Sequence, residues 1–321
     1  MPIRLLMRRF ILTAVLVALV LPTSAGSAVR LGVVGDKPRF HRQTGQASQI
    51  HMKYSTWNTG LNRPDTMDSW FQTHLPIPMI TLHTKNKYDK EAITPRGLAR
   101  GRGDRFLLQI SRAAHRFGRE TYIRPFAEMN GHWNYYCAYN KNGTYRGVSH
   151  STANFKRAFR RVYLIMHGGP RAQINAKLAA LNMPALRTSH DVPENPLVKV
   201  FWNPQGYGSP NIRKNSANAY YPGDKYVDVF GNDLYDIGYR AAWDANSTLF
   251  KSHPSKPFLI GEWGLWGIDD PSFIRHMAHF VAAHPRVKGI VWYKSQKGSM
   301  FDLGSKPKSL AAYKKYIVPL G

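Results

Sequence analysis

The stretch PFLIGEWG, residues 257–264, is a short apolar run that leads directly into a glutamate. A continuous apolar run, as opposed to a strict apolar–polar alternation, is typical of a parallel strand covered on both faces. Other strand-like segments along the chain are RLGVVG (30–35), IHMKYSTW (50–57), IPMITLHT (77–84), TYIRPFAEM (121–129), VKVFWNP (198–204), YVDVFGNDLY (226–235) and VKGIVWYK (287–294). The sequence therefore predicts eight strands, several of them buried on both faces.

Helix-like segments separate these strands. Residues 104–118 place apolar residues at helical spacing behind Asp104, which stands at a capping position. Residues 154–169 end at paired glycines, 271–285 open with a proline, and SLAAYKKYIVPLG closes the chain. Eight strands that alternate with helices predict an α/β fold, a (β/α)8 TIM barrel, with a doubly wound open sheet as the alternative. Residues 174–196 are long for one connection and predict a decorated loop or an extra helix.

The N-terminus has the layout of a secretory signal peptide. Three arginines precede the 12-residue apolar run 10–21, and the small residues TSAGSA follow it. We expect residues 1–28 to be the signal, residues 29–321 to form one catalytic domain, and the mature protein to be secreted. An uncleaved N-terminal anchor is the alternative, although 12 apolar residues are few for a bilayer span.

The charge of the chain is strongly positive. Lys and Arg number 45 against 19 Asp and Glu, a net charge of +26, or +23 without the three signal arginines. Such a balance suits anionic partners, among them acidic cell-wall polymers, but the interpretation we favour is a basic solvated surface. The basic residues are spread along the chain, and no sequence pattern indicates specific nucleic-acid binding. Their densest run is PRGLARGRGDR, residues 95–105.

Cysteine usage and short motifs limit the chemistry further. Cys137 is the single cysteine, so no intramolecular disulfide forms and no zinc site with two cysteines exists. We expect a buried thiol there. The sequence has no HExxH, no phosphate-binding glycine loop and no dinucleotide-binding motif. We therefore expect no metal site and no cofactor, and we expect a monomer.

Two of the five glutamates stand apart from the rest. Glu91, Glu120 and Glu194 lie in polar surroundings, whereas Glu128 and Glu262 each follow an apolar strand-like segment. A barrel gathers the carboxyl ends of its strands around one mouth, where active sites form. Two carboxylates that face each other across such a mouth suit glycoside hydrolysis, with one as acid and the other as nucleophile or base. The alternative is a structural ion pair with Arg124.

Aromatic residues near the predicted strand ends support binding of a sugar. Pyranose rings stack their C–H faces on Trp and Tyr, and core packing is the alternative role at each position. Tyr235 is also placed to donate a hydrogen bond to the nucleophile. The candidate positions are Trp57, Trp133, Trp202, Tyr235, Trp266 and Trp292.

These residues resemble a known family. RPFAEMNGHWNYY (124–136) resembles the acid/base segment of glycoside hydrolase family 26, whose best-known members are β-mannanases. VFWNPQG and YYPGDKYVDVFGNDLYD resemble its fifth and sixth strands, and PFLIGEWG resembles its nucleophile strand. The combination of EMNG-x-W, YPGD-x-YVD-x-x-G-x-D-x-Y and GEWG is specific, and the resemblance covers nearly all of residues 30–316.

The resemblance implies a retaining, endo-acting glycosidase with Glu128 as acid/base and Glu262 as nucleophile. It also implies a set of positions that line or support the cleft: Arg124, Asn130, Trp133, Trp202, Asp233, Tyr235 and Trp292. Many mannanases of the family have His immediately before the acid/base and Trp directly after the IT of the third strand, whereas this chain has Ala127 and Leu82. The implied substrate is β-1,4-mannan or mixed-linkage β-glucan, and the family also contains β-1,3-xylanases.

Two other functions are compatible with the sequence. One is a non-catalytic or weakly catalytic glycan-binding protein of the cell wall, built on a hydrolase scaffold. The other is a polyanion binder, whose binding falls steeply with salt. An anionic wall glycan as substrate would reconcile the positive charge with the carboxylate pair.

Overall fold

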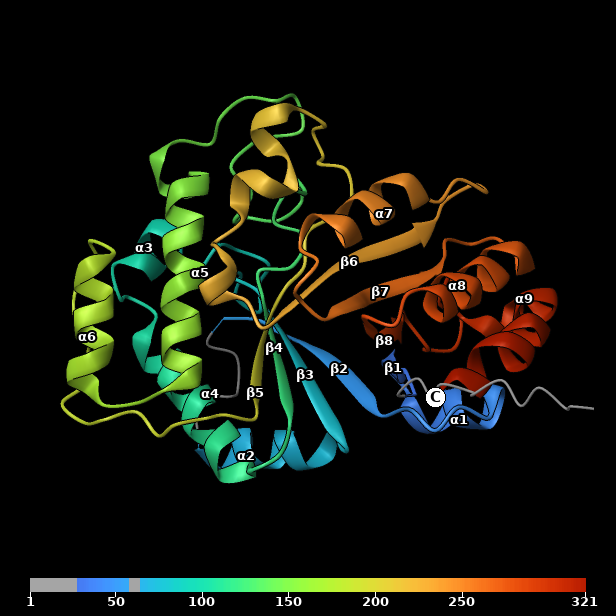
Figure 1. Ribbon diagram of the computed structural model, residues 1–321, viewed down its shortest axis with the longest axis horizontal. Coiled ribbons are helices and arrows are strands. Elements are labelled where there is room, and N and C mark those ends of the chain that lie inside the picture. Colours follow the sequence, from blue (N-terminus) through green and yellow to red (C-terminus); the bar gives the residue numbers. More distant parts are fainter. Residues whose placement is uncertain (1–27, 58–63) are drawn as a thin grey trace, which may run out of the picture.

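A computed structural model describes residues 28–57 and 64–321. The predicted signal peptide, residues 1–28, lies almost wholly outside the described residues. The strands are β1 (Arg30–Val34), β2 (Ile50–Ser55), β3 (Ile77–Leu82), β4 (Thr121–Pro125), β5 (Val198–Trp202), β6 (Val229–Asp236), β7 (Phe258–Leu265) and β8 (Val287–Trp292). Each pairs in parallel with the next, and β8 pairs with β1. The described residues therefore form the predicted closed eight-stranded barrel (Figure 1).

Helices surround the barrel. They are α1 (Lys37–Thr44), α2 (Pro64–Thr73), α3 (Pro95–Ala99), α4 (Asp104–Phe117), α5 (Thr152–His167), α6 (Arg171–Ala180), α7 (Trp243–Ser252), α8 (Pro271–Ala283) and α9 (Pro307–Ala312). Short helical turns are η1 (Val148–His150), η2 (Arg213–Asn215), η3 (Ala217–Tyr220), η4 (Asp224–Tyr226), η5 (Leu303–Ser305), η6 (Tyr313–Ile317) and η7 (Val318–Leu320). Helix α6 is the extra helix expected before the fifth strand. None of the described helices combines the length and apolar character that crossing a bilayer requires.

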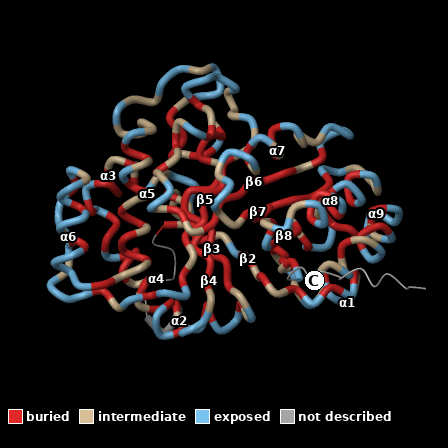
Figure 2. The backbone as a smooth tube through the Cα atoms, in the orientation of Figure 1, coloured by how far each residue is buried: buried red, intermediate tan, exposed pale blue. Residues whose placement is uncertain are grey.

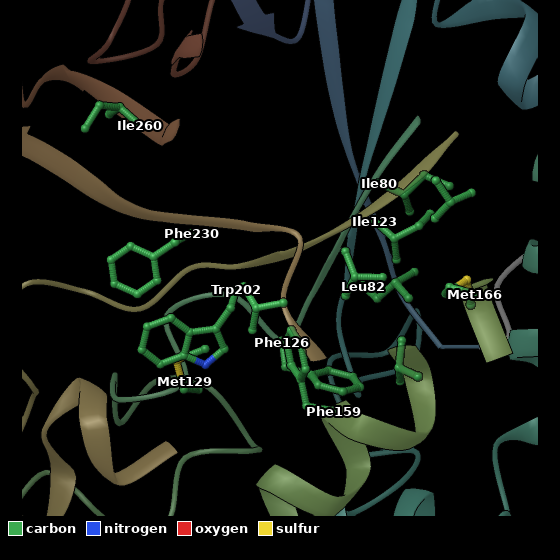
Figure 3. Packing of buried hydrophobic residues seen from close by; sticks show 14 of the residues in the cluster. Ile80, Leu82, Ile123, Phe126, Met129, Phe159, Met166, Trp202, Phe230 and Ile260 are labelled. Atoms are coloured by element: carbon green, nitrogen blue, oxygen red, sulfur yellow. The ribbon is translucent and has the colours of Figure 1, made fainter. Parts of the chain in front are cut away.

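Two apolar clusters hold the fold together. The smaller one takes buried residues from all eight strands, including Val34, Met79 and Phe201, and fills the barrel interior. The larger one joins the outer faces of the strands to the helices, as around Trp202 and Phe230 in Figure 3. Figure 2 shows the resulting layers, with a buried barrel and exposed outer helix faces. Cys137 is a buried free thiol, as predicted.

The ends of several elements differ from the predictions. Strand β4 stops at Pro125, not at Met129, because Phe126 and Glu128 adopt left-handed backbone conformations with φ of 55° and 53°. Asp104 is the first residue of α4 and makes no capping hydrogen bond. Its carboxylate instead pairs with Arg161 of α5, and both side chains are fully buried. The predicted closing helix divides into α9 and the turns η6 and η7.

Candidate active site

Glu262 lies near the carboxyl end of β7, where three side chains donate hydrogen bonds to its carboxylate. Arg124 and the hydroxyl of Tyr54 each donate to Oε1 at 2.5 Å. The hydroxyl of Tyr235 donates to Oε2 at 2.5 Å, the role expected for this tyrosine. Glu262 is 6% exposed. Both oxygens are therefore held by hydrogen bonds, while a small part of the residue stays exposed.

Arg124 ties two carboxylates together inside the barrel. It lies in β4, is fully buried, and pairs with Glu262 through one nitrogen and with Asp233 of β6 through another. Burial alone would lower the pKa of Arg124, but Asp233 and Glu262 together raise it above its ordinary value. Its positive charge is therefore available to orient and balance Glu262. The alternative of an ion pair with Arg124 is therefore observed for Glu262 but not for Glu128, because the second partner of Arg124 is Asp233.

Glu128 lies in the turn after β4 and has different partners. Its Oε1 accepts a hydrogen bond from Gln205 at 2.9 Å, and its Oε2 accepts one from the indole of Trp133 at 3.0 Å. Burial and the negative charge of Glu262 raise its pKa, while Gln205, Arg124 and Trp133 act in the opposite direction. Glu128 is thereby suited to hold a proton at a pH where an ordinary carboxyl group has lost it.

The turn that carries Glu128 is held by a chain of hydrogen bonds. The backbone N–H of Glu128 donates to the carbonyl of Asn203, which directly follows β5. The amide of Asn130, fully buried, donates to the carbonyl of Gln205 and accepts from its backbone N–H, both at 2.9 Å. Because Gln205 in turn contacts the carboxylate, Asn130 positions Glu128 indirectly. Left-handed residues other than glycine cost about 1 kcal/mol or more, so such anchoring is needed.

Two exposed tryptophans flank the carboxylates. Trp133 is 49% exposed and donates to Glu128, and its ring lies against Gly131, where a Cβ atom would be 2.5 Å from the indole. Trp266 is 44% exposed, and its ring centroid lies 5.8 Å from that of Tyr235, the tyrosine that holds Glu262. Both rings offer an accessible face beside a catalytic candidate, as stacking of a sugar requires.

A cavity of about 540 Å³ extends from the Glu262 side of the mouth. Trp266, Tyr293 and Phe301 form its aromatic part, and Lys294 and Lys297 add two cations. Tyr293 connects it to the carboxylate site, because its ring centroid lies 5.7 Å from that of Tyr235 and 6.2 Å from that of Tyr54. The cavity is large enough for about one or two pyranose units beside Trp266.

Three of the predicted sugar-binding tryptophans are in the core instead. Trp202 and Trp292 are fully buried, and Trp57 is 3% exposed. Trp202 stacks on Phe230 at 5.1 Å, and Trp292 packs edge-on against Trp263 at 4.8 Å. Side chains alternate between the two faces of a strand, and Trp202 of β5 and Trp292 of β8 lie on the face that packs against helices. The prediction that Trp202 and Trp292 contact substrate is therefore wrong for this structure.

Tyr54 and Gln205 are site residues that sequence reasoning missed. Tyr54 lies one residue before the end of β2, and Gln205 follows β5 by three residues in NPQG. Their position near the carboxyl ends of barrel strands is the sequence feature that could have identified them as site residues. In the described parts of the chain, no cluster of three or more His, Cys, Asp or Glu side chains is placed to hold a metal ion.

Comparison with known proteins agrees with this site. The model of glycosyl hydrolase family 26 matches residues 202–298, which include Asp233, Tyr235 and Glu262. Residues 202–298 of this chain are therefore similar to glycosyl hydrolase family 26. The matched segment covers the Glu262 half of the site, and Glu128 lies before it.

The chain also resembles individual proteins. Endoglucanase H of Acetivibrio thermocellus is 21% identical over 96% of the chain, which spans 33% of the length of that protein. A mannanase of Bacillus subtilis superposes with a TM-score of 0.56 at 16% identity, over 90% of this chain and 85% of its own. A β-mannanase of Bacteroides ovatus gives 0.57 at 15% identity, over 90% and 88%. At these identities the structural likeness establishes the shared barrel fold.

Proposed function

We propose that the protein is a secreted, retaining endo-β-glycanase that hydrolyses internal β-linkages of a polysaccharide, with β-1,4-mannan as the first substrate and mixed-linkage β-glucan as the second. The observation that carries the proposal is the contrast between the two carboxylates. Glu262 receives three hydrogen bonds, one of them from its ion-pair partner Arg124, whereas burial and a neighbouring negative charge raise the pKa of Glu128. Two carboxyl groups in opposed environments divide the roles of nucleophile and acid.

The chemistry follows from these roles. Glu262 attacks the anomeric carbon and forms an ester bond to it, while Glu128 gives its proton to the glycosidic oxygen and that C–O bond breaks. Glu128, now ionised, takes a proton from water. The resulting hydroxide attacks the same carbon and releases Glu262, so the product keeps the β configuration. Trp133 and Trp266 support sugar units on the Glu128 and Glu262 sides of the bond.

The polysaccharide assignment rests on relatives. Mannanases share the fold, and the relative from Acetivibrio thermocellus is named an endoglucanase. Ala127 and Leu82, which replace residues common in mannanases, have apolar side chains and are buried, so neither offers a polar contact to a mannose unit. The alternative of a non-catalytic wall glycan binder predicts binding without product release.

The test is product release from soluble β-mannan, glucomannan, mixed-linkage β-glucan and β-1,3-xylan. We expect one polymer to be cut, and we expect Glu128→Ala and Glu262→Ala to lower kcat by about 10³-fold or more. Glu194→Ala, which removes an exposed glutamate, is the matched control and should retain full activity. Proton NMR of the first product should show the β anomer.

Two results would contradict the proposal. If Glu262→Ala released product at the wild-type rate, Glu262 would not be the nucleophile. If the first product were the α anomer, the mechanism would be inverting. Binding to a polymer without release, by a folded protein, would support the glycan-binding alternative. Export is checked separately by N-terminal sequencing of protein recovered from the culture medium, with a start near Val29 expected.

A further inference from the structure

A second polar cavity lies in the helix layer, away from the carboxylate pair. It has a volume of about 280 Å³ and is bordered by α3, by α5 and by residues 182–184 after α6. Helices α3, α5 and α6 lie next to one another on one side of the barrel (Figure 1). The arginine pocket, as we name it, is lined by Arg96 and Arg100 from α3 and its C-cap, and by Arg157 from α5. Two of these arginines belong to the densest basic run of the sequence.

The charge of this pocket is uncompensated. Its lining contains three arginines, two neutral amides, Asn154 and Asn182, and no Asp or Glu. Within residues 28–57 and 64–321, the three guanidinium groups have no hydrogen-bond or ion-pair partner. By contrast, Arg161, which lies on the same helix as the exposed Arg157 but is fully buried, is paired with Asp104.

The neighbouring acidic groups are already engaged. Asp104 is bound by two nitrogens of Arg161 and by the backbone N–H of Arg187. Glu91 accepts from His150 at 3.0 Å through both oxygens. Neither carboxylate is available to the arginine pocket without giving up existing partners. The positive charges around this cavity are therefore free to bind an external anion.

We propose that the arginine pocket binds a phosphate group. A guanidinium presents paired N–H donors that match two oxygens of a phosphate, and three such groups match a tetrahedral dianion better than a carboxylate with one charge and two oxygens. The volume suits a single phosphate with a small substituent. The group can come from a free phosphate ester or from the backbone of an anionic polymer, and the chemistry of recognition is the same.

The experiment is calorimetric titration of the whole protein with inorganic phosphate, at constant ionic strength maintained with chloride. The test variant is R96Q/R100Q/R157Q. The matched control is R42Q/R171Q/R275Q, which removes the same charge at three exposed arginines outside the pocket. We expect saturable one-to-one binding by the wild type and the control, and at least about ten-fold weaker binding by the test variant. Circular dichroism checks that both variants fold.

Two results would overturn the proposal: no saturable binding by the wild type, or an equal loss in the test and control variants. The latter would indicate a response to net charge alone. The single variant R157Q, which leaves α3 unchanged, should show an intermediate loss, and full retention of affinity by it would also count against the site.

A second titration distinguishes the sources of the phosphate group. It compares glycerol phosphate with poly(glycerol phosphate), using the same three proteins. If the polymer is the source, its affinity should fall at least about ten-fold more in the test variant than in the control. If only glycerol phosphate depends on the pocket, the source is a free phosphate ester. Polysaccharide hydrolysis should be unchanged in the test variant, because the pocket lies outside the carboxylate site.

Discussion

At the scale of single residues, the site depends on how each carboxylate is bound. Glu262 is held by Arg124 and two tyrosines, while Glu128 has two neutral donors, Gln205 and Trp133. The pKa of Glu128 is raised by burial and by Glu262, and the neutral donors moderate that rise because they stabilise the ionised form. In the proposed mechanism, the balance between them sets the pH range in which Glu128 is a proton donor.

Removing the Gln205 side-chain amide should therefore shift the pH profile. In Gln205→Leu, the ionised form of Glu128 loses a hydrogen bond, so its pKa rises further and the alkaline limb of kcat/KM moves to higher pH. The limb reports protonated Glu128, which must be present for the leaving group to receive its proton. The measurement is kcat/KM against pH on the polymer that the protein cuts.

Gln72→Leu is the control for this prediction, because Gln72 is exposed on α2 and far in sequence from the site. Its profile should match that of the wild type. An alkaline limb that stays in place, or moves to lower pH, in Gln205→Leu would show that this hydrogen bond does not stabilise the ionised acid.

At the scale of secondary-structure elements, a buried ion pair joins two helices of the outer layer. Arg161 of α5 pairs with Asp104 of α4 and also donates to the carbonyls of Pro184 and Ala185, in the segment after α6. One side chain thus connects α4, α5 and the α6 connection. Removing one partner of such a pair leaves a buried charge without compensation.

Arg161→Met should lower the free energy of unfolding by about 3–5 kcal/mol. The double variant Asp104→Leu/Arg161→Met should recover part of that loss, since no buried charge remains unpaired. Urea unfolding followed by circular dichroism measures both. Arg116→Gln, which breaks the exposed pair with Asp68, is the control and should cost less than about 1 kcal/mol. A loss of that small size in Arg161→Met would contradict the argument.

At the scale of the whole molecule, the net charge of +26 acts on charged partners and leaves neutral ones unaffected. If the substrate is a neutral β-mannan or β-glucan, kcat/KM should change little between about 0.02 and 0.5 M NaCl, because screening has no substrate charge to act on. Retention of the protein on an anionic resin should fall steeply over the same range. Initial rates and column elution measure the two responses.

A steep fall of hydrolysis with salt would contradict this prediction and would identify the substrate as acidic. The lysines of the Trp266 cavity, Lys294 and Lys297, would then be the first groups to test. A neutral variant of the same glycan backbone serves as the control, because the salt effect should vanish with the substrate charge.

Local sequence patterns determined the strands of the barrel and the positions of the two candidate carboxylates. Eight apolar runs predicted the eight strands, because a strand buried on both faces needs a continuous apolar segment. Such a segment can be recognised from its own residues alone. The same runs marked Glu128 and Glu262 as residues near strand ends, and Tyr235 as a donor to Glu262. These features depend on which residues follow one another along the chain, and the sequence gives that order directly.

Only the tertiary structure decided the contacts that join distant segments. The choice of Glu262 and Asp233 as the partners of Arg124 follows from barrel register, and the support of Glu128 by Gln205 follows from two loops that meet. The side chains of Trp202 and Trp292 lie in the core because the last residues of a strand point alternately toward the mouth and toward the helix layer. A one-residue change of register reverses that alternation, and register is set by packing of the whole barrel.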